Sequence, residues 1–594
     1  MYLRPHRRMR GGTVYEYWSL VRTIRTARGP RQRTVAFIGK APGLDGESRL
    51  GWEHLAEALD GREHDGDLFA GPQPEPPQWA TVDVKRVRVE RLRQFGNVYL
   101  ALALWRRLGL SDVLDSVQPK GREEVPWPTM ACILTLARFC EPSSELKIGE
   151  QWYAQTALED MLGVPVARVN DDRLYRALDA LLPGREALFQ HLQTRYAQWF
   201  GTTFDILLYD ITSTFFEGRM QRNPQARRGY SRDGRPDCLQ LCIGLIVTPD
   251  GLPVAYEVFD GNRTDVTTVE EVIETMRRKY GHERRIWVMD RGMVSEEILE
   301  HLRGWGASYL VGTPKAMLRQ FETHLLDERD WSRLANGVEV KLCQRPDGSR
   351  ERFVLCRAPG RREKERAMRQ RQVNRMEAEL DALQRAIRRP VRPLRHRPVV
   401  DQRIGRILQR YPRAARLIDI TVTDAPCLDL TWEVRTSDAA WADLADGAYL
   451  LRTNMAEADP QSVWETYIRL TQVEFSFRVS KTDLGIRPVY HHTDTRAQAH
   501  ILVCFLALVL WRTLEKWMSS CGLGTAPRLL LDELAQVHSM DVILPTHAGR
   551  DLRLRVVSRP EPRLGLLLDQ LHLSLPSEPL RVENVVQKKP LPEM

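Results

Sequence analysis

The stretch Phe204-Asp-Ile-Leu-Leu-Tyr-Asp210 decides the fold, because it is an apolar run that ends on a carboxylate. A second run of this kind, Ile286-Trp-Val-Met-Asp290, is followed by an arginine and a glycine. Short apolar runs bounded by turn residues are typical of buried strands. The two runs therefore predict two strands, each with an aspartate at its end.

The segments around these runs predict the order of the neighbouring elements. The turn Thr248-Pro-Asp-Gly251 predicts a hairpin between two apolar strands. The expected elements are strands at 204–209, 238–248 and 252–259, a helix at 266–280, a strand at 286–290, a helix at 294–304 and a strand at 308–312. This order describes an α/β fold with a ribonuclease-H-like (RNase-H-like) sheet, in which the first strand and the strand after the first helix are central neighbours. We therefore expect Asp210 and Asp290 to lie close together.

A third acid stands in a helical pattern. Residues 460–481 predict one helix, on which Glu474, Arg478 and Lys481 share a face at spacings i, i+4 and i+7. Tyr467 precedes Glu474 by two turns on the same face. The apolar face that would hold this helix on the sheet consists of Leu470, Val473 and Phe477. A carboxylate flanked by cations is consistent with a phosphate backbone lying across the helix.

Asp210, Asp290 and Glu474 together suit metal-dependent phosphodiester chemistry. Carboxylate oxygens are preferred ligands of Mg²⁺, which takes substrate phosphate oxygens as further ligands. Two ions roughly 3.5–4 Å apart would activate the attacking group and stabilise the leaving oxygen. Asp210 is the better candidate for the bridging carboxylate, because it would lie at the centre of the sheet.

Each acid also has an ordinary structural interpretation. Asp210 and Asp290 could be turn residues, and Glu474 could form a surface pair with Arg478. Such exposed helix pairs contribute only roughly 0.3–0.5 kcal/mol and are common. The occurrence of all three acids in the right order favours the catalytic interpretation.

Other residues compete for these roles. Asp205 competes with Asp210, but it would lie at the far end of the strand. Glu457 and Glu465 compete with Glu474, yet neither is followed by a lysine seven residues later. A metal site could also be considered at His491, His492 and His500. Because no cysteine partners lie nearby in that stretch, structural histidines or phosphate contacts are the favoured interpretation.

The charge of the chain points to a polyanionic partner. Its 594 residues are 43% hydrophobic, which indicates a globular protein, and its formal net charge is +9. Residues 1–40 hold ten Lys/Arg against one acid, and residues 361–397 hold thirteen against five. Two basic segments far apart in sequence favour an extended binding surface for a long polyanionic substrate over a single basic tail.

The cysteine content and the apolar segments indicate a reducing compartment. The nine cysteines are scattered, and we expect Cys238 and Cys242 to be reduced residues on one side of a strand. The N-terminal region has basic residues but no apolar segment typical of a signal peptide. The most apolar stretch, 501–511, is too short to span a membrane and predicts a buried core helix at 495–518.

The rest of the chain predicts several further parts. We expect a basic β-hairpin at 13–40, a helical region at 93–200 in which Leu174, Leu178 and Leu181 form a buried stripe, and an Arg-rich helix at 361–389. Further strands are expected in a hairpin at 337–357 and at 418–423, 429–435 and 448–453. The predicted domains are an N-terminal basic β region with a linker at its end (1–78), a helical DNA-binding domain (79–200), the first part of the RNase-H-like core (201–315), a β-rich insertion with the Arg-rich helix (316–459), the second part of the core with the Glu474 helix (460–520) and a C-terminal region (521–594).

Four motifs in order resemble bacterial insertion-sequence transposases of the branch with a tyrosine–arginine–glutamate–lysine signature. Tyr209-Asp-Ile-Thr-Ser-Thr-Phe-Phe-Glu217 and Val288-Met-Asp-Arg-Gly292 resemble the two aspartate motifs of that branch. Tyr467, Glu474 and Lys481 resemble the signature, and Arg487-Pro-Val-Tyr-His-His492 resembles the tail that follows it. The resemblance covers roughly residues 200–515, with a weaker match through the N-terminal third.

One position departs from the signature. Its arginine falls on Leu470, and Arg469 or Arg478 are the neighbouring residues that could supply the charge. The departure keeps open whether this copy is active.

The resemblance implies a DDE transposase whose RNase-H-like core is interrupted by a mainly β insertion. It implies that Asp210, Asp290 and Glu474 are catalytic and hold two Mg²⁺ ions, which Mn²⁺ could replace. Tyr467, Arg478 and Lys481 would then contact DNA. The implied substrate is double-stranded DNA, both element ends and target, held by a homodimer in the bacterial cytoplasm at the nucleoid. The alternatives are an RNase-H-like nuclease without joining activity and a catalytically inactive DNA-binding regulator.

Overall fold

The computed structural model describes residues 2–10, 13–26, 29–39, 80–117, 121, 123–218, 220, 222–263, 271, 274, 285–293, 295–344, 351–425, 427–547, 550–579 and 581–586. The chain forms two compact units: unit 1 is Met1–Val272 with Thr471–Met594, and unit 2 is Ile273–Leu470. The linker expected at 71–78, most of the helix expected at 266–280 and the turn at Pro346-Asp-Gly348 lie outside the described residues.

The N-terminal part of unit 1 is an antiparallel sheet of β1 (Tyr2–Arg10), β2 (Thr13–Thr26) and β3 (Gly29–Gly39). β2 pairs with β3 as well as with β1. The hairpin predicted at 13–40 is therefore confirmed, and β1 extends it to a third strand.

A bundle of helices follows β4 (Arg88–Gln94) in unit 1. Its members are α2 (Gly96–Leu108), α3 (Leu110–Val117), α4 (Trp127–Cys140), α5 (Glu145–Lys147), α6 (Tyr153–Gln155), α7 (Leu158–Leu162), α8 (Asp171–Leu181) and α9 (Arg185–Phe200). The predicted stripe of α8 is confirmed, because Leu174, Leu178 and Leu181 are all buried. Asn170 caps this helix by accepting a hydrogen bond from the backbone N–H of Arg173 at 2.9 Å.

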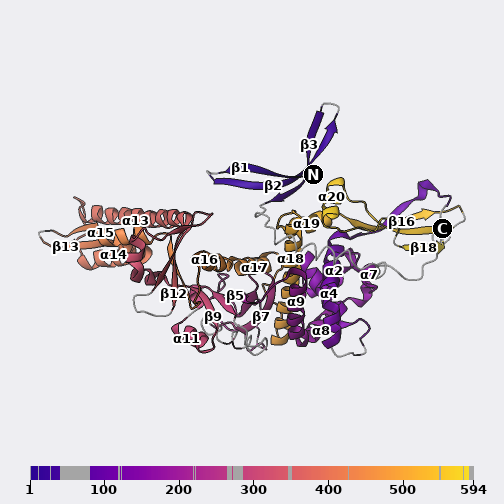
Figure 1. The fold of residues 1–594 in the computed structure, drawn as a ribbon, viewed down its shortest axis with the longest axis horizontal. Helices are drawn as coiled ribbons and strands as arrows, with labels where there is room; N and C mark the ends of the chain where they lie inside the picture. Colours follow the sequence, from indigo (N-terminus) through magenta and orange to yellow (C-terminus); the bar gives the residue numbers. More distant parts are fainter. Residues whose placement is uncertain are drawn as a thin grey trace. The chain divides into compact units, whose positions relative to one another are not determined.

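Helix α18 (Asp494–Ser520) forms the core of this bundle, lying against α4, α8 and α2 (Figure 1). The ring of Trp511 on α18 packs edge-on against Phe139 of α4, with centroids 6.2 Å apart. The helix is long and apolar enough to cross a membrane, contrary to the expectation from the 501–511 stretch. Its most apolar window is nevertheless 94% buried inside the protein, which confirms the predicted core helix.

Unit 1 also contains a four-stranded antiparallel sheet with the strand order β18-β17-β16-β4. It joins β4 to β16 (His538–Pro545), β17 (Arg550–Val557) and β18 (Arg581–Val586). In sequence, α19 (Pro527–Leu534) precedes β16, and α20 (Pro562–Gln570) lies between β17 and β18. Residues 88–94 are therefore a strand that pairs with a segment more than four hundred residues later, inside a region expected to be helical.

Unit 1 also contains the antiparallel strands β5 (Ile206–Phe215), β6 (Gln240–Val247) and β7 (Pro253–Asp260). The β6–β7 hairpin is confirmed, and its turn closes with a 2.8 Å hydrogen bond from the Gly251 N–H to the Thr248 carbonyl. Gly251 has a φ of +81°, a backbone conformation that favours glycine. Helix α17 (Thr471–Thr482) packs on β5 and β6, and α18 packs on β7.

Unit 2 contains a mixed sheet whose strands follow the order β10-β11-β12-β15-β9-β8. They are β8 (Ile286–Met289), β9 (Ser308–Gly312), β10 (Ser332–Arg333), β11 (Glu339–Gln344), β12 (Arg352–Arg357) and β15 (Ala448–Thr453). β8 and β9 are parallel and joined by α11 (Glu296–Gly304), as predicted. α12 (Glu322–Leu326) and α16 (Pro460–Ile468) complete this part.

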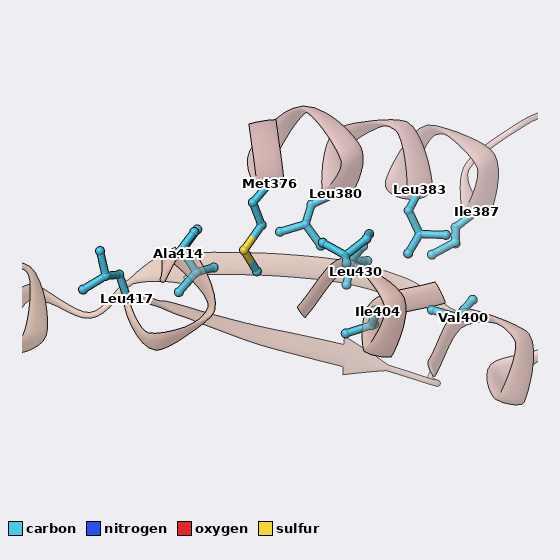
Figure 2. Close-up of a cluster of buried hydrophobic side chains, with 11 residues drawn as sticks. Met376, Leu380, Leu383, Ile387, Val400, Ile404, Ala414, Leu417 and Leu430 are labelled. Carbon is cyan, nitrogen blue, oxygen red and sulfur yellow. The ribbon is translucent and has the colours of Figure 1, made fainter. Parts of the chain in front are cut away.

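A small subdomain of unit 2 has its own hydrophobic core (Figures 1 and 2). It consists of α13 (Pro359–Ile387), α14 (Arg397–Arg410), the antiparallel pair β13 (Ile418–Thr423) and β14 (Asp429–Val434), and α15 (Thr436–Ala445). The predicted Arg-rich helix is confirmed, since Met376, Leu380, Leu383 and Ile387 all point from α13 into this core. Leu430 of β14 and Val400 of α14 face them.

Candidate active site

Asp210 and Glu474 both belong to unit 1. Asp210 is half-buried in β5, and its Oδ1 accepts a 2.7 Å hydrogen bond from the Ile211 N–H. Glu474 is exposed in the first turn of α17, the helix that packs on β5 through the buried side chains of Val473 and Phe477. Of the predicted apolar face, Val473 and Phe477 are buried on this helix, whereas Leu470 lies before its first residue.

The expectation that Asp210 ends its strand is wrong. β5 continues to Phe215, because Ile211, Thr212 and Thr214 are β-branched and all three are buried. Asp210 instead lies in the middle of the strand, opposite Leu245 of β6. The competing Asp205 precedes β5 and is exposed.

The expectation of one helix over 460–481 is also wrong. The segment breaks at Arg469 and Leu470 into α16 and α17, and the Leu470 N–H bonds the Tyr467 carbonyl at 3.0 Å in a turn. Leu470 is 8% exposed, so its burial favours the break over a continuous helix. Tyr467 therefore lies on a different helix from Glu474, and the two do not share one helical face.

Asp290 and Tyr467 meet within unit 2. Asp290 is exposed directly after β8, and its Oδ1 accepts a 3.2 Å hydrogen bond from the Tyr467 hydroxyl. Burial and the charge of Asp290 raise the pKa of Tyr467, so the phenol stays protonated and acts as a donor. Gly312, the last residue of β9, leaves room for this phenol, because a Cβ there would lie 2.4 Å from the hydroxyl oxygen.

Lys481, the last member of the signature, is engaged by an acid. Its ammonium donates a 2.9 Å hydrogen bond to Oδ1 of Asp233, a residue of the segment between β5 and β6. Arg487 forms an ion pair with the same oxygen. Burial lowers the pKa of Lys481, although the neighbouring Asp233 opposes the shift.

Arg478 is exposed on α17 and faces a polar pocket. Its guanidinium lies 4.9 Å from the centre of the Phe475 ring, and that of Arg512 lies 5.0 Å from the same ring. The pocket has a volume of about 420 Å³, and Asp250 and Lys516 also line it. Cations next to an open pocket are suited to contacts with phosphate oxygens.

A buried cluster of metal-capable side chains lies elsewhere in unit 1. Donor atoms of Glu145, His491 and His500 all lie within 4.8 Å of one another. His491 Nε2 lies 3.4 Å from Glu145 Oε1, and His500 is hydrogen-bonded to the Ile486 carbonyl at 3.2 Å. His492 is exposed and is not one of the three. The geometry is compatible with a metal ion and equally with a self-contained hydrogen-bonded cluster.

The pKa values describe how this cluster is charged. Burial alone would raise the pKa of Glu145, but the hydrogen bond with His491 and the nearby histidine charges lower it to about 2. Burial and the charge of Arg138 push the pKa of His500 well below its usual value. Glu145 is therefore ionised and His500 neutral near pH 7.

The structure thus groups the predicted site residues in two sets. Asp210 and Glu474 lie on packed elements of unit 1, whereas Asp290 and Tyr467 meet in unit 2. The sequence analysis missed Asp233, Gly312 and Glu145. The sequence around these residues gives no sign of their roles, because the partner of each lies far away in sequence and is brought close only by folding.

Two family models match the chain, and each covers one of its parts. A model for the transposase DDE domain matches residues 204–510, which is more than half of the sequence and includes Asp210, Asp290 and Glu474. The chain belongs to the DDE transposase family. A model for the N-terminal domain of IS1634-family transposases matches residues 3–71 of this transposase, the part that contains β1 to β3. No curated protein matches the sequence.

The family membership confirms the coarse functional prediction. Transposases of these families act on DNA, and the DDE family implies the use of a divalent metal. The mixed α/β architecture of the described residues is consistent with this family.

Proposed function

We propose that this transposase cuts the ends of its own insertion sequence and joins the freed 3′-hydroxyl to target DNA. The observation that carries the proposal is the 204–510 match, because it spans all three acids of the predicted triad in order. The same region contains Lys481 and Tyr467 of the tyrosine–arginine–glutamate–lysine signature. DNA cleavage and strand transfer are both phosphodiester displacements, so one site serves both steps.

The acids fit a pair of magnesium ions by their chemistry. Asp210, Asp290 and Glu474 offer only carboxylate oxygens, the ligand type that Mg²⁺ prefers. Asp290 and Glu474 are exposed and Asp210 is half-buried, so solvent and substrate can reach them. When bound, the two ions supply charge neutralisation at the scissile phosphate and lower the pKa of the attacking hydroxyl.

The remaining residues orient the substrate and the acids. Tyr467 holds the Asp290 carboxylate in one orientation through its phenolic hydrogen bond. Lys481 and Arg478 on α17 contact phosphates of the DNA backbone on either side of the scissile bond. Leu470 is buried, so the missing arginine of the signature is replaced by an exposed cation nearby, Arg469 or Arg478. Two copies of the chain pair the two element ends.

The test is a cleavage and joining assay on labelled DNA that carries the element's own ends. The natural chain is compared with Asp290→Ala, with and without Mg²⁺. Asp205→Ala is the matched control, because it removes an exposed aspartate just before β5. Cleavage and joining by the natural chain and the control, both lost in Asp290→Ala while DNA binding persists, would support the proposal.

Two other results would replace the proposal. Cutting without joining by the natural chain would make the protein a nuclease. Tight DNA binding without cutting in every variant would make it an inactive regulatory copy. Cleavage that persists in Asp290→Ala would show that the site assignment is wrong.

A further inference from the structure

Asp233 is an almost fully buried carboxylate in a strongly basic environment. Its side chain is 5% exposed, and its Oδ1 contacts both Lys481 and Arg487. The other oxygen, Oδ2, is buried without a hydrogen-bond partner among the described residues. Two cations thus converge on one carboxylate oxygen while its second oxygen is left unsatisfied, which costs free energy. The Asp233 carboxylate therefore satisfies the site between Lys481 and Arg487 only in part.

The two cations that hold Asp233 are themselves well fixed. Lys481 is on the last turn of α17, seven residues after Glu474, and its side chain is 12% exposed. Arg487 follows in the loop between α17 and α18, and its side chain is 28% exposed. An ammonium and a guanidinium that converge on one point are a common arrangement for binding an oxyanion such as a backbone phosphate.

The segment that carries Asp233 is a short turn outside the regular strands. The Arg235 N–H donates to the Ser231 hydroxyl at 2.9 Å, and Gly234 has a φ of +69°. The Arg232 N–H bonds the Ser213 hydroxyl of β5 at 3.2 Å, which connects the turn to the strand that holds Asp210. Arg235 of the same turn also pairs with Glu217 and lies over the Phe215 ring at the end of β5. Because Asp233 belongs to this turn and not to a strand, its side chain can move away without unfolding the sheet.

We propose that Lys481 and Arg487 form a binding site for a phosphate of the DNA backbone, and that Asp233 fills this site in the DNA-free protein. The proposal rests on the proposed function, in which α17 contacts DNA. It adds Arg487 as a DNA contact and makes Asp233 an internal competitor of the substrate phosphate. When DNA binds, a backbone phosphate replaces the Asp233 carboxylate at Lys481. Asp233 therefore weakens DNA binding by the same factor whatever the DNA sequence.

The test measures affinity of the full-length chain for a labelled DNA duplex of arbitrary sequence over a series of salt concentrations. A chelator is present, so that cleavage does not interfere. Asp233→Asn is compared with Asp237→Asn, which removes the charge of an exposed acid on the same segment, hydrogen-bonded to Arg235. We expect Asp233→Asn to bind about 5- to 10-fold tighter near 0.1 M salt, with a slope of log K against log salt steeper by about 0.9. An equal gain in affinity for Asp237→Asn would show that the effect comes from the net charge of the protein alone, and this would overturn the proposal.

Arg487→Gln gives a test that does not depend on how Asp233→Asn folds. We expect this variant to bind the duplex several-fold more weakly, with a slope shallower by about 0.9. The double variant Asp233→Asn with Lys481→Ala should lose most of the gain of Asp233→Asn alone. The phosphate-site proposal would be wrong if Arg487→Gln bound DNA like the natural chain at all salt concentrations. It would also be wrong if the affinity gain of Asp233→Asn persisted without Lys481. Neither result would affect the transposase assignment. A natural chain that binds no DNA would overturn both.

Discussion

The acids of the proposed active site contrast with the acid of the buried histidine cluster. Glu145 is enclosed with His491 and His500, and its Oε1 lies 3.4 Å from His491 Nε2 inside the fold. Asp290 and Glu474 are exposed, and neither is enclosed in such a cluster. The contrast teaches that charge placed in the interior mainly holds the chain together, whereas charge left at the surface is available to a ligand. Substitutions in the two regions should therefore change different measurements.

The largest effect is expected from Glu474→Gln. This change keeps the size of the side chain but removes the negative charge of a proposed metal ligand. We expect cleavage to fall by roughly three orders of magnitude, about 4 kcal/mol in barrier height. The free energy of unfolding should change by less than about 0.5 kcal/mol, because the side chain is exposed. Single-turnover cleavage and denaturant unfolding measure the two effects, and a large loss of stability would contradict the comparison.

Glu145→Gln should show the opposite behaviour. Removing the buried carboxylate leaves the polar groups around it without their partner, so we expect a loss of about 2 kcal/mol in the free energy of unfolding. At a temperature where the variant is folded, cleavage should stay within about threefold of the natural chain. Denaturant unfolding and cleavage rates check the two parts. A loss of activity without a loss of stability would place this cluster in the catalytic machinery.

The buried cluster should also make stability depend on pH. The pKa of His500 lies well below its usual 6.5 in the fold, so below pH 6.5 the unfolded chain takes up a proton that the folded chain does not. Stability should therefore fall with decreasing pH by up to about 1.4 kcal/mol per unit. The contribution of Glu145 is present above pH 4.5 and is lost as the pH falls toward 2. Unfolding midpoints at several pH values measure both, and His500→Asn should flatten the upper part of the profile.

The smallest effect is expected from Tyr467→Phe, which removes the hydrogen bond to Asp290. A bond of this kind contributes about 1 kcal/mol, which corresponds to roughly a fivefold slower cleavage. Gly312→Ala should cost at least as much, because the added methyl group would collide with the Tyr467 hydroxyl. In the double variant the two effects should be less than additive, since both act through Asp290. Full additivity of the two rate losses would show that Gly312 acts elsewhere.

Local patterns predicted most of the described elements. The apolar seam of α13, the capped stripe of α8 and the turn between β6 and β7 are all defined by residues close in sequence. In the same way, the two aspartate runs identified β5 and β8. Such features follow from periodicity and turn chemistry, which a single sequence displays directly.

The failures arose where distant segments decide the outcome. The pairing of β16 with β4 joins segments at opposite ends of the chain and has no local signal, whereas the alternating burial of β16 and its pairing with β17 were a local signal that the sequence analysis missed. The pairing of Lys481 with Asp233 joins positions 248 residues apart. Burial of Leu470 ended the helix that spacing alone would have continued. These contacts depend on the folded chain, so the local sequence does not display them.

The position of α18 has a consequence for how the protein is made. Helices α4 and α8 bury their apolar faces against α18, which the ribosome adds more than three hundred residues later. At roughly 5–20 residues per second, the growing chain holds these faces open for tens of seconds. The N-terminal half therefore cannot complete its core until synthesis has passed residue 520. Until α18 has been made, the nascent chain of this transposase exposes apolar surface of the kind that chaperones bind.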